Sequence, residues 1–141
     1  MSYRHLQTYK VNEVSTAGKM KLVLMMYDGA IRFLNECKKK MRENDIAGRG
    51  LYLSKAQKIV GELQESLNRQ KGGEVASSLE KAYHLITIKL TQANINGDIA
   101  MVDQSISLLN DIREAWLKIS SDPKLNLKDK NNASSRVAIN L

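Results

Sequence analysis

The sequence predicts an all-α protein, namely an antiparallel four-helix bundle with a flexible N-terminal arm and a disordered C-terminal tail. Aromatic residues make up only 5% of its 141 residues and proline occurs once, so the clusters typical of strands are scarce. Four segments place apolar residues three or four positions apart, which is the period of a buried helix face. Short links between them favour antiparallel packing. We expect an arm over residues 1–16, a bundle over 17–121 and a tail over 122–141.

The first predicted helix covers about residues 20–41 and passes through Asp28-Gly29, a pair that usually marks a turn. The apolar spacing continues on both sides of this pair, so we expect no break there. Asp28 falls on the polar side, where Arg32 is four residues away and can pair with it. The inward stripe consists of Met20, Val23, Tyr27, Ala30, Leu34, Cys37 and Met41.

The other three helices are predicted over about 45–67, 74–96 and 98–120. The segment "NRQKGG" ends the second helix, Gly97 stands where a C-terminal glycine belongs, and Asp98 caps the fourth helix. Asp122-Pro123 then stops the chain's last helix. The inward stripes are Leu53, Ala56, Val60, Leu63 and Leu67, then Ala76, Leu79, Tyr83, Ile86, Leu90 and Ala93, and finally Val102, Ile106, Leu109, Ile112, Trp116 and Ile119.

Targeting signals and membrane spans are not evident in the sequence. The first residues lack the apolar stretch of a signal peptide, and no run reaches the roughly 18 apolar residues that a span needs. We therefore expect a cytoplasmic protein without membrane insertion. The single cysteine, Cys37, allows no intramolecular disulfide and no cysteine-based zinc site, and reads as a core residue.

Catalytic and cofactor motifs are also missing from the sequence. A di-iron site in a helical bundle needs Glu-x-x-His pairs, whereas here Glu80 and His84 are four apart and the other histidine is His5. The glycines of "KGGE" and "AGRG" lack the spacing of a phosphate-binding loop, and no nucleophile-elbow pattern occurs. We predict no catalytic residue, no metal and no cofactor, hence no enzyme.

The formal net charge of +7 raises the alternative of a basic helical module that binds nucleic acid. The densest basic cluster, Lys38 to Arg42, lies at the end of the first helix, where cations complement the helix dipole. No aromatic residues alternate with the basic ones to stack on bases. We expect no nucleic-acid partner and keep this reading as the alternative.

The helices carry more apolar residues than one buried stripe requires. These lie on a second face of the first, third and fourth helices: Leu22, Met26, Gly29 and Phe33; Leu85, Ile88 and Ile95; and Met101, Leu108 and Ala115. One explanation is that corner helices of a bundle touch two neighbours. The other is a set of apolar grooves that bind a partner. Gly29 fits a groove because a residue without a side chain lets another backbone approach closely.

Three motifs in this order resemble the flagellar secretion chaperone family FliS. They are "YKVNEVSTAGKMKLVLMMYDGAIRFL" at residues 9–34, "KGGEVASSLEKAYHLITIKLTQANINGD" at 71–98, and "LLNDIREAWLKI" at 108–119. The resemblance extends over about residues 3–120. Two departures are Gly18-Lys19, where many members have Ser-Pro, and Met26, where leucine is usual.

The resemblance implies a four-helix bundle that binds the disordered C-terminal segment of flagellin in the cytoplasm. It further implies that binding prevents premature polymerisation and helps deliver flagellin to the type III export apparatus. Our predicted flagellin contacts are Leu22, Met26, Gly29 and Phe33, with Leu85, Ile88, Met101 and Leu108 as partners. Tyr27 is expected to support the groove from beneath. The free protein is expected to be a monomer or a weak dimer.

The N-terminal segment contains apolar residues that follow no helical period, among them Leu6 and Tyr9. An empty apolar groove is an aggregation hazard. We therefore expect residues 3–14 to cover the stripe on the first helix until flagellin displaces them. The alternative is that Tyr9 packs permanently on the bundle. The family resemblance also implicates this tyrosine region in contacts with the export gate.

Overall fold

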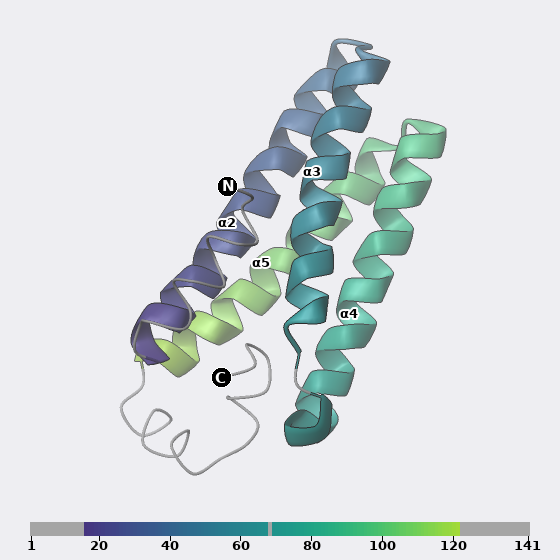
Figure 1. Cartoon of the computed structure of the whole chain (residues 1–141). Coiled ribbons are helices and arrows are strands. Elements are labelled where there is room, and N and C mark those ends of the chain that lie inside the picture. Colours follow the sequence, from purple (N-terminus) through teal and green to yellow (C-terminus); the bar gives the residue numbers. More distant parts are fainter. Residues whose placement is uncertain (1–15, 68, 122–141) are drawn as a thin grey trace.

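The computed structural model describes residues 16–67 and 69–121, and within them it contains four helices and no strand (Figure 1). Helix α2 spans Thr16–Arg42, α3 spans Ile46–Glu65, α4 spans Arg69–Asn96 and α5 spans Ile99–Ser121. The all-α prediction is confirmed. The predicted N-terminal arm and C-terminal tail, including Leu6 and Tyr9, lie outside the described residues.

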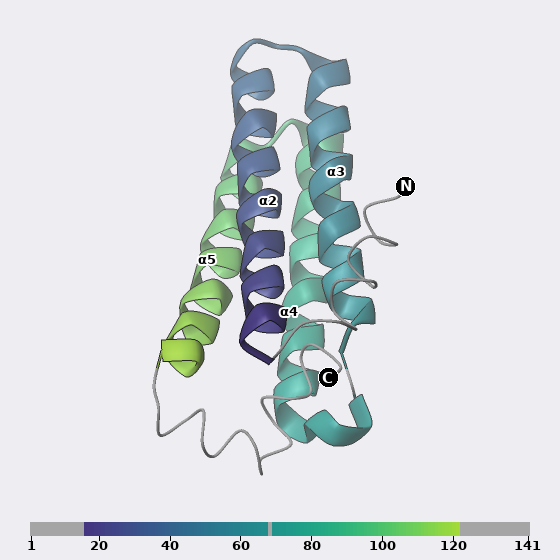
Figure 2. The ribbon, with the colours of Figure 1, turned by 60° about the vertical axis from the view of Figure 1, so that its left-hand side comes forward.

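Successive helices run in opposite directions and form an up-and-down bundle (Figures 1 and 2). Helix α2 packs beside α3 and α5, and α4 packs beside the same two helices. Helices α2 and α4 therefore face each other diagonally across the core. Each helix is a corner helix with two close neighbours. A second apolar stripe on a helix can therefore pack against its second neighbour.

The core is built from the stripes that the three-four spacing predicts. Most predicted inward residues are buried, and Cys37 is among them. Met41, Leu79, Ile106 and Ile112 are only partly buried against the core, and the side chain of Ile119 is outside the described set. One core position was missed because its residue is polar. Ser105 is fully buried, and its hydroxyl donates a hydrogen bond to the carbonyl of Met101 at 2.9 Å.

Gly97 and Asp98 lie at the helix boundary predicted for them, and Asp45 is a further N-terminal cap that was not predicted. The Asp45 side chain accepts a hydrogen bond from the backbone N–H of Gly48 at 2.9 Å. The Asp98 side chain accepts one from the backbone N–H of Ala100 at 3.0 Å, and Gly97 has a φ of 65°. Both side-chain oxygens satisfy N–H groups that have no partner within the helix. These caps make the turns between the helices short and well defined.

The link before α4 differs from the prediction. Helical structure begins at Arg69, inside the segment expected to be a loop, and Gly73 interrupts it with φ 48° and ψ −125°. This backbone conformation suits glycine because it has no Cβ. The segment thus forms a short helical piece, a kink at Gly73, and then the main part of α4.

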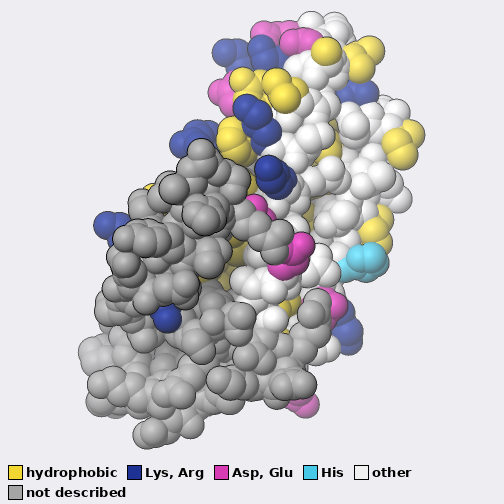
Figure 3. Space-filling model, in the orientation of Figure 1, with side chains coloured by type: hydrophobic (Ala, Val, Ile, Leu, Met, Phe, Trp, Pro, Cys, Tyr) yellow, Lys and Arg dark blue, Asp and Glu magenta, His cyan; other side chains and the backbone are white. Residues whose placement is uncertain are grey.

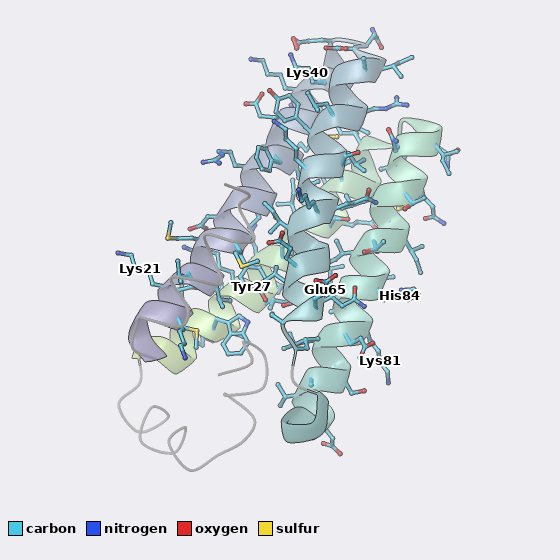
Figure 4. All side chains as sticks on the ribbon, viewed as in Figure 1. Lys21, Tyr27, Lys40, Glu65, Lys81 and His84 are labelled. Atoms are coloured by element: carbon cyan, nitrogen blue, oxygen red, sulfur yellow. The ribbon has the colours of Figure 1, made fainter. Side chains whose placement is uncertain are left out.

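A buried polar cluster joins three of the four helices. The indole N–H of Trp116 in α5 donates to the hydroxyl of Tyr27 in α2 at 3.1 Å. The Tyr27 hydroxyl is in turn hydrogen-bonded to the hydroxyl of Tyr83 in α4. Both tyrosines are almost completely buried, so their polar atoms satisfy one another in the core. Tyr27 therefore lies on the core side of α2, and Figure 4 labels it there.

Candidate functional site

The second apolar stripe of α2 faces α3. A Cβ added at Gly29 would lie 3.4 Å from the Cδ1 atom of Ile59. The rings of Phe33 and Tyr52 lie with centroids 6.2 Å apart. Gly29 and Phe33 thus belong to the contact between two neighbouring helices, as expected for a corner helix. A Cβ at Gly29 would therefore touch only the terminal methyl of Ile59, and larger side chains would extend further toward α3.

Met26 lies in the core, and the expectation that it lies on an open stripe is wrong. Its side chain is only 2% exposed and belongs to the same buried cluster as Val23 and Ala30. The physical reason is helical spacing, because residues 23, 26 and 30 share one face of the helix. Leu22, four residues earlier, remains partly exposed.

Cations cover the aromatic pair between α2 and α3. The Lys55 ammonium lies 5.4 Å from the ring centroid of Phe33 and 5.5 Å from that of Tyr52, and the Arg32 guanidinium lies 5.5 Å from Phe33. Cations at this distance are attracted to the ring face. Phe33 is therefore partly shielded from solvent.

Helices α2 and α3 are close at their connecting turn and diverge toward the N-terminal end of α2 (Figure 1). We call the contact between them the α2–α3 seam. We define it by the helical stripe of Leu22, Gly29 and Phe33 in α2 and the facing stripe of Tyr52, Ile59 and Glu62 in α3, with contacts observed between Gly29 and Ile59 and between Phe33 and Tyr52. Gly29 opposes Ile59 near the middle. Because the helices are antiparallel, Leu22 and Glu62 lie at the diverging end.

A second apolar surface lies along α4 and α5, and we call it the α4–α5 surface. Leu85 and Ile88 of α4 are 43% and 42% exposed, and Met101 and Leu108 of α5 are partly buried against the core. The Lys89 ammonium donates to the side-chain oxygen of Gln104 at 2.6 Å, so residues 89 and 104 lie opposite each other in the two helices. Leu85 precedes Lys89 by four residues and Leu108 follows Gln104 by four. Because the two helices are antiparallel, Leu85 and Leu108 lie at the same height along the bundle. The structure thus brings these predicted residues to one side of the bundle.

Some exposed apolar residues were not identified from the sequence. These are Ile46 and Leu51 of α3, which are 70% and 54% exposed. They are joined by Ile95 of α4, which was predicted on a second stripe and is 74% exposed. They lie near the end of the bundle that carries the α2–α3 and α4–α5 turns, where Arg49 donates to the Asn94 carbonyl at 2.7 Å. Figure 3 shows apolar side chains among lysines and arginines at this end. Leu51 lies off the core stripe of α3, and this position could have predicted its exposure from the sequence.

The contact between α2 and α5 is bordered by ion pairs. Asp28 pairs with Arg113 of α5 at 2.6 Å, so the predicted pairing with Arg32 is wrong. The pairing goes to α5 because that helix packs beside α2, while Arg32 lies over Phe33. Lys38 pairs with Asp103, also at 2.6 Å. The bond to Asp28 raises the pKa of Arg113, so this guanidinium stays charged.

Residues 16–67 and 69–121 contain neither a metal-binding cluster nor a membrane-spanning helix. No group of three or more His, Cys, Asp or Glu side chains in this part could hold a metal ion. His84 is exposed on the outer side of α4, and Figure 4 shows it near Lys81. None of the described helices is long and apolar enough to cross a membrane.

Comparison with known proteins places this bundle in a family. The family model described as "Flagellar protein FliS" matches residues 2–123. The chain belongs to the FliS family. Its resemblance to that family, first drawn from three motifs, is confirmed over nearly the whole bundle.

FliS relatives cover most of the chain. The FliS flagellar secretion chaperone of Vibrio cholerae is 34% identical over 118 residues, which is 81% of this chain and 87% of the relative. That of Salmonella typhimurium is 33% identical over 117 residues, or 82% and 85%. FliSB of Pseudomonas aeruginosa is 30% identical over 108 residues, or 77% and 86%. These FliS relatives are named as chaperones rather than enzymes.

Proposed function

We propose that this FliS-family protein is a non-enzymatic, cytoplasmic export chaperone whose client is flagellin. It binds the disordered C-terminal segment of flagellin, prevents premature polymerisation and delivers the subunit to the flagellar type III export apparatus. The observation that carries the proposal is the exposure of Leu85 and Ile88 beside a core that is complete without them. Apolar side chains that the fold does not use are typical of a surface for a partner.

The mode of binding that we propose is an amphipathic segment in an apolar groove. Leu85 and Ile88 supply exposed contacts on the α4–α5 surface, with Met101 and Leu108 beneath them. On the α2–α3 seam, Leu22 and the diverging end supply a second contact region, while Met26 and Tyr27 support it from the core. Folding of the client on these surfaces would bury about 1,000 to 3,000 Å².

Residues 3–14 are proposed to act as a displaceable lid. They would cover the seam through Leu6 or Tyr9 in the free protein, and displacement by the client would release this segment to contact the export gate. Deleting residues 1–14 should shift the methyl NMR signal of Leu22 and tighten client binding about tenfold, which corresponds to about 1 to 2 kcal/mol of lid closure. Unchanged shifts together with unchanged affinity would remove this role.

A polymerisation assay tests the proposed function. Monomeric flagellin is seeded with filament fragments in the presence of an equimolar amount of the protein, and pelletable polymer is measured. We expect strong inhibition and a complex with flagellin in gel filtration. A flagellin truncated at its C-terminal segment serves as the control and should not co-elute. Normal polymerisation without any complex would refute the proposal.

A further inference from the structure

One buried carboxylate oxygen of the structure lacks a hydrogen-bond partner. Oε2 of Glu62 is inaccessible to solvent, and no residue within 16–67 or 69–121 donates to it. It is the single buried side-chain nitrogen or oxygen of this kind in that part of the chain. A buried polar atom without a partner weakens a fold, and a charged one weakens it more. Its presence therefore needs a physical explanation.

The position of Glu62 places this oxygen on the α2–α3 seam. Tyr52, Lys55 and Ile59 contact or oppose residues of α2, and Glu62 continues their three-four spacing along the same face of α3. One turn beyond the Gly29–Ile59 contact, Glu62 lies at the level of Met26 and toward Leu22. Its buried oxygen thus belongs to the α2-facing side of α3. Figure 1 shows that the two helices diverge toward this end of α3.

Packing alone gives no reason for a glutamate here. Methionine has a similar length and a similar helix propensity, and it would not bury an unpaired oxygen. A residue that lowers the stability of the free protein can be explained if a bound ligand supplies its hydrogen-bond partner. Proteins break local stability rules mainly at functional sites. The seam is also part of the surface proposed above for the client.

We propose that Glu62 is the polar anchor of the client site, and that its Oε2 accepts a hydrogen bond from an N–H donor of the bound segment. This inference rests on the proposed function and adds the chemistry of recognition. The segment must present one N–H donor among apolar side chains. The donor is either a lysine or arginine side chain or a main-chain amide in the first turn of a client helix, which has no partner within that helix.

The test compares three variants of the full chain in melting experiments and in titrations with a flagellin C-terminal peptide. Glu62→Met keeps the length and removes the acceptor, Glu62→Gln keeps an acceptor without charge, and Glu65→Met is the matched control. Glu65 lies on the same helix and is exposed (Figure 4). We expect Glu62→Met to raise Tm and to weaken binding about tenfold or more. Glu65→Met should leave both close to the wild type.

Glu62→Gln identifies the donor. Binding within about threefold of the wild type indicates an amide donor, whereas a loss as large as that of Glu62→Met indicates a cation. Wild-type affinity in Glu62→Met would overturn the inference and leave the proposed function intact. A lower Tm for Glu62→Met would also overturn it, because Glu62 would then serve the fold. Absence of binding by the wild type would instead refute the proposed function itself.

Discussion

The indole N–H of Trp116 and the hydroxyl of Tyr27 are 3.1 Å apart, although 89 positions separate the two residues in the chain. Their hydrogen bond joins α5 to α2 inside the core, and the hydroxyl of Tyr83 extends the connection to α4. Buried networks of this kind favour one packing arrangement when every member is satisfied. The cluster therefore holds three helices in register beneath the surfaces proposed to bind the client.

Tyr27→Phe should destabilise the protein by about 1 to 3 kcal/mol, because it leaves the Trp116 N–H and the Tyr83 hydroxyl without a common partner. Tyr83→Phe should cost less, since the Tyr27 hydroxyl keeps its bond to Trp116. Tyr52→Phe, at a partly exposed position, is the control and should change stability little. Denaturant unfolding followed by the fluorescence of Trp116 measures all three. Equal stability of Tyr27→Phe and the wild type would contradict a structural role for the cluster.

Alkaline pH should unfold the protein through the same tyrosines. Burial raises the pKa of Tyr27 from 10.0 to about 12, and burial together with Tyr27 raises the pKa of Tyr83. The folded state thus holds these protons more tightly than the unfolded state. The resulting stability is complete below about pH 10 and is lost as the pH rises toward 12.

Melting temperature between pH 8 and pH 12 measures this loss, with tyrosinate absorbance recorded in parallel. The Tyr27→Phe/Tyr83→Phe double variant should show a shallower decline above pH 10, although it is less stable at neutral pH. An equally steep decline in that variant would assign the alkaline transition to other groups.

Gly29 should respond to substitution according to the size of the new side chain. Gly29→Ala should raise stability by up to about 1 kcal/mol through helix propensity, because its Cβ meets only the terminal methyl of Ile59 at 3.4 Å. Gly29→Leu should lower stability by about 1 to 3 kcal/mol, because the larger side chain overpacks the seam. Thermal melts of both variants check this. A stable, fully packed Gly29→Leu protein would mean that the seam opens easily at this point.

Two exposed leucines of the described helices allow a test of the α4–α5 surface. Leu85 and Leu51 are 43% and 54% exposed, so replacing either with serine should change stability little. Leu85→Ser should weaken flagellin binding severalfold, because apolar contact area is lost. Leu51→Ser, which lies outside both proposed surfaces, should bind like the wild type. If Leu51→Ser instead bound flagellin more weakly than Leu85→Ser, the client would bind near the end of the bundle that carries the α2–α3 and α4–α5 turns.

Helical spacing and capping residues were enough to predict the helices and nearly all of the core. They work because each stripe is repeated over several turns, so single ambiguous residues such as Gly29 do not change the result. The same spacing cannot tell which neighbour a side face touches. Gly29 and Phe33 were therefore consistent with both a groove and a helix contact, and the structure decided for contact with α3.

Interactions between helices distant in sequence were beyond prediction. Asp28 had a suitable cation four residues away, yet it pairs with Arg113 because α5 lies beside α2. Nothing in the sequence singled out Glu62, because the burial of its oxygen and the lack of a hydrogen-bond partner are visible only in the folded structure. Leu85 and Leu108 were predicted on separate helices, and the antiparallel register brings them to one level.

We propose that apolar surfaces of this bundle bind the C-terminal segment of flagellin. Isothermal titration of the full chain with that peptide, at low salt and at tenfold higher salt, tests it most directly. We predict a Kd in the micromolar range or tighter that changes less than about threefold with salt, since apolar contacts are little affected by screening. A basic module for nucleic acid would instead bind DNA or RNA with an affinity that falls steeply with salt. No binding of the peptide at micromolar concentrations, with no complex in gel filtration, would contradict the claim.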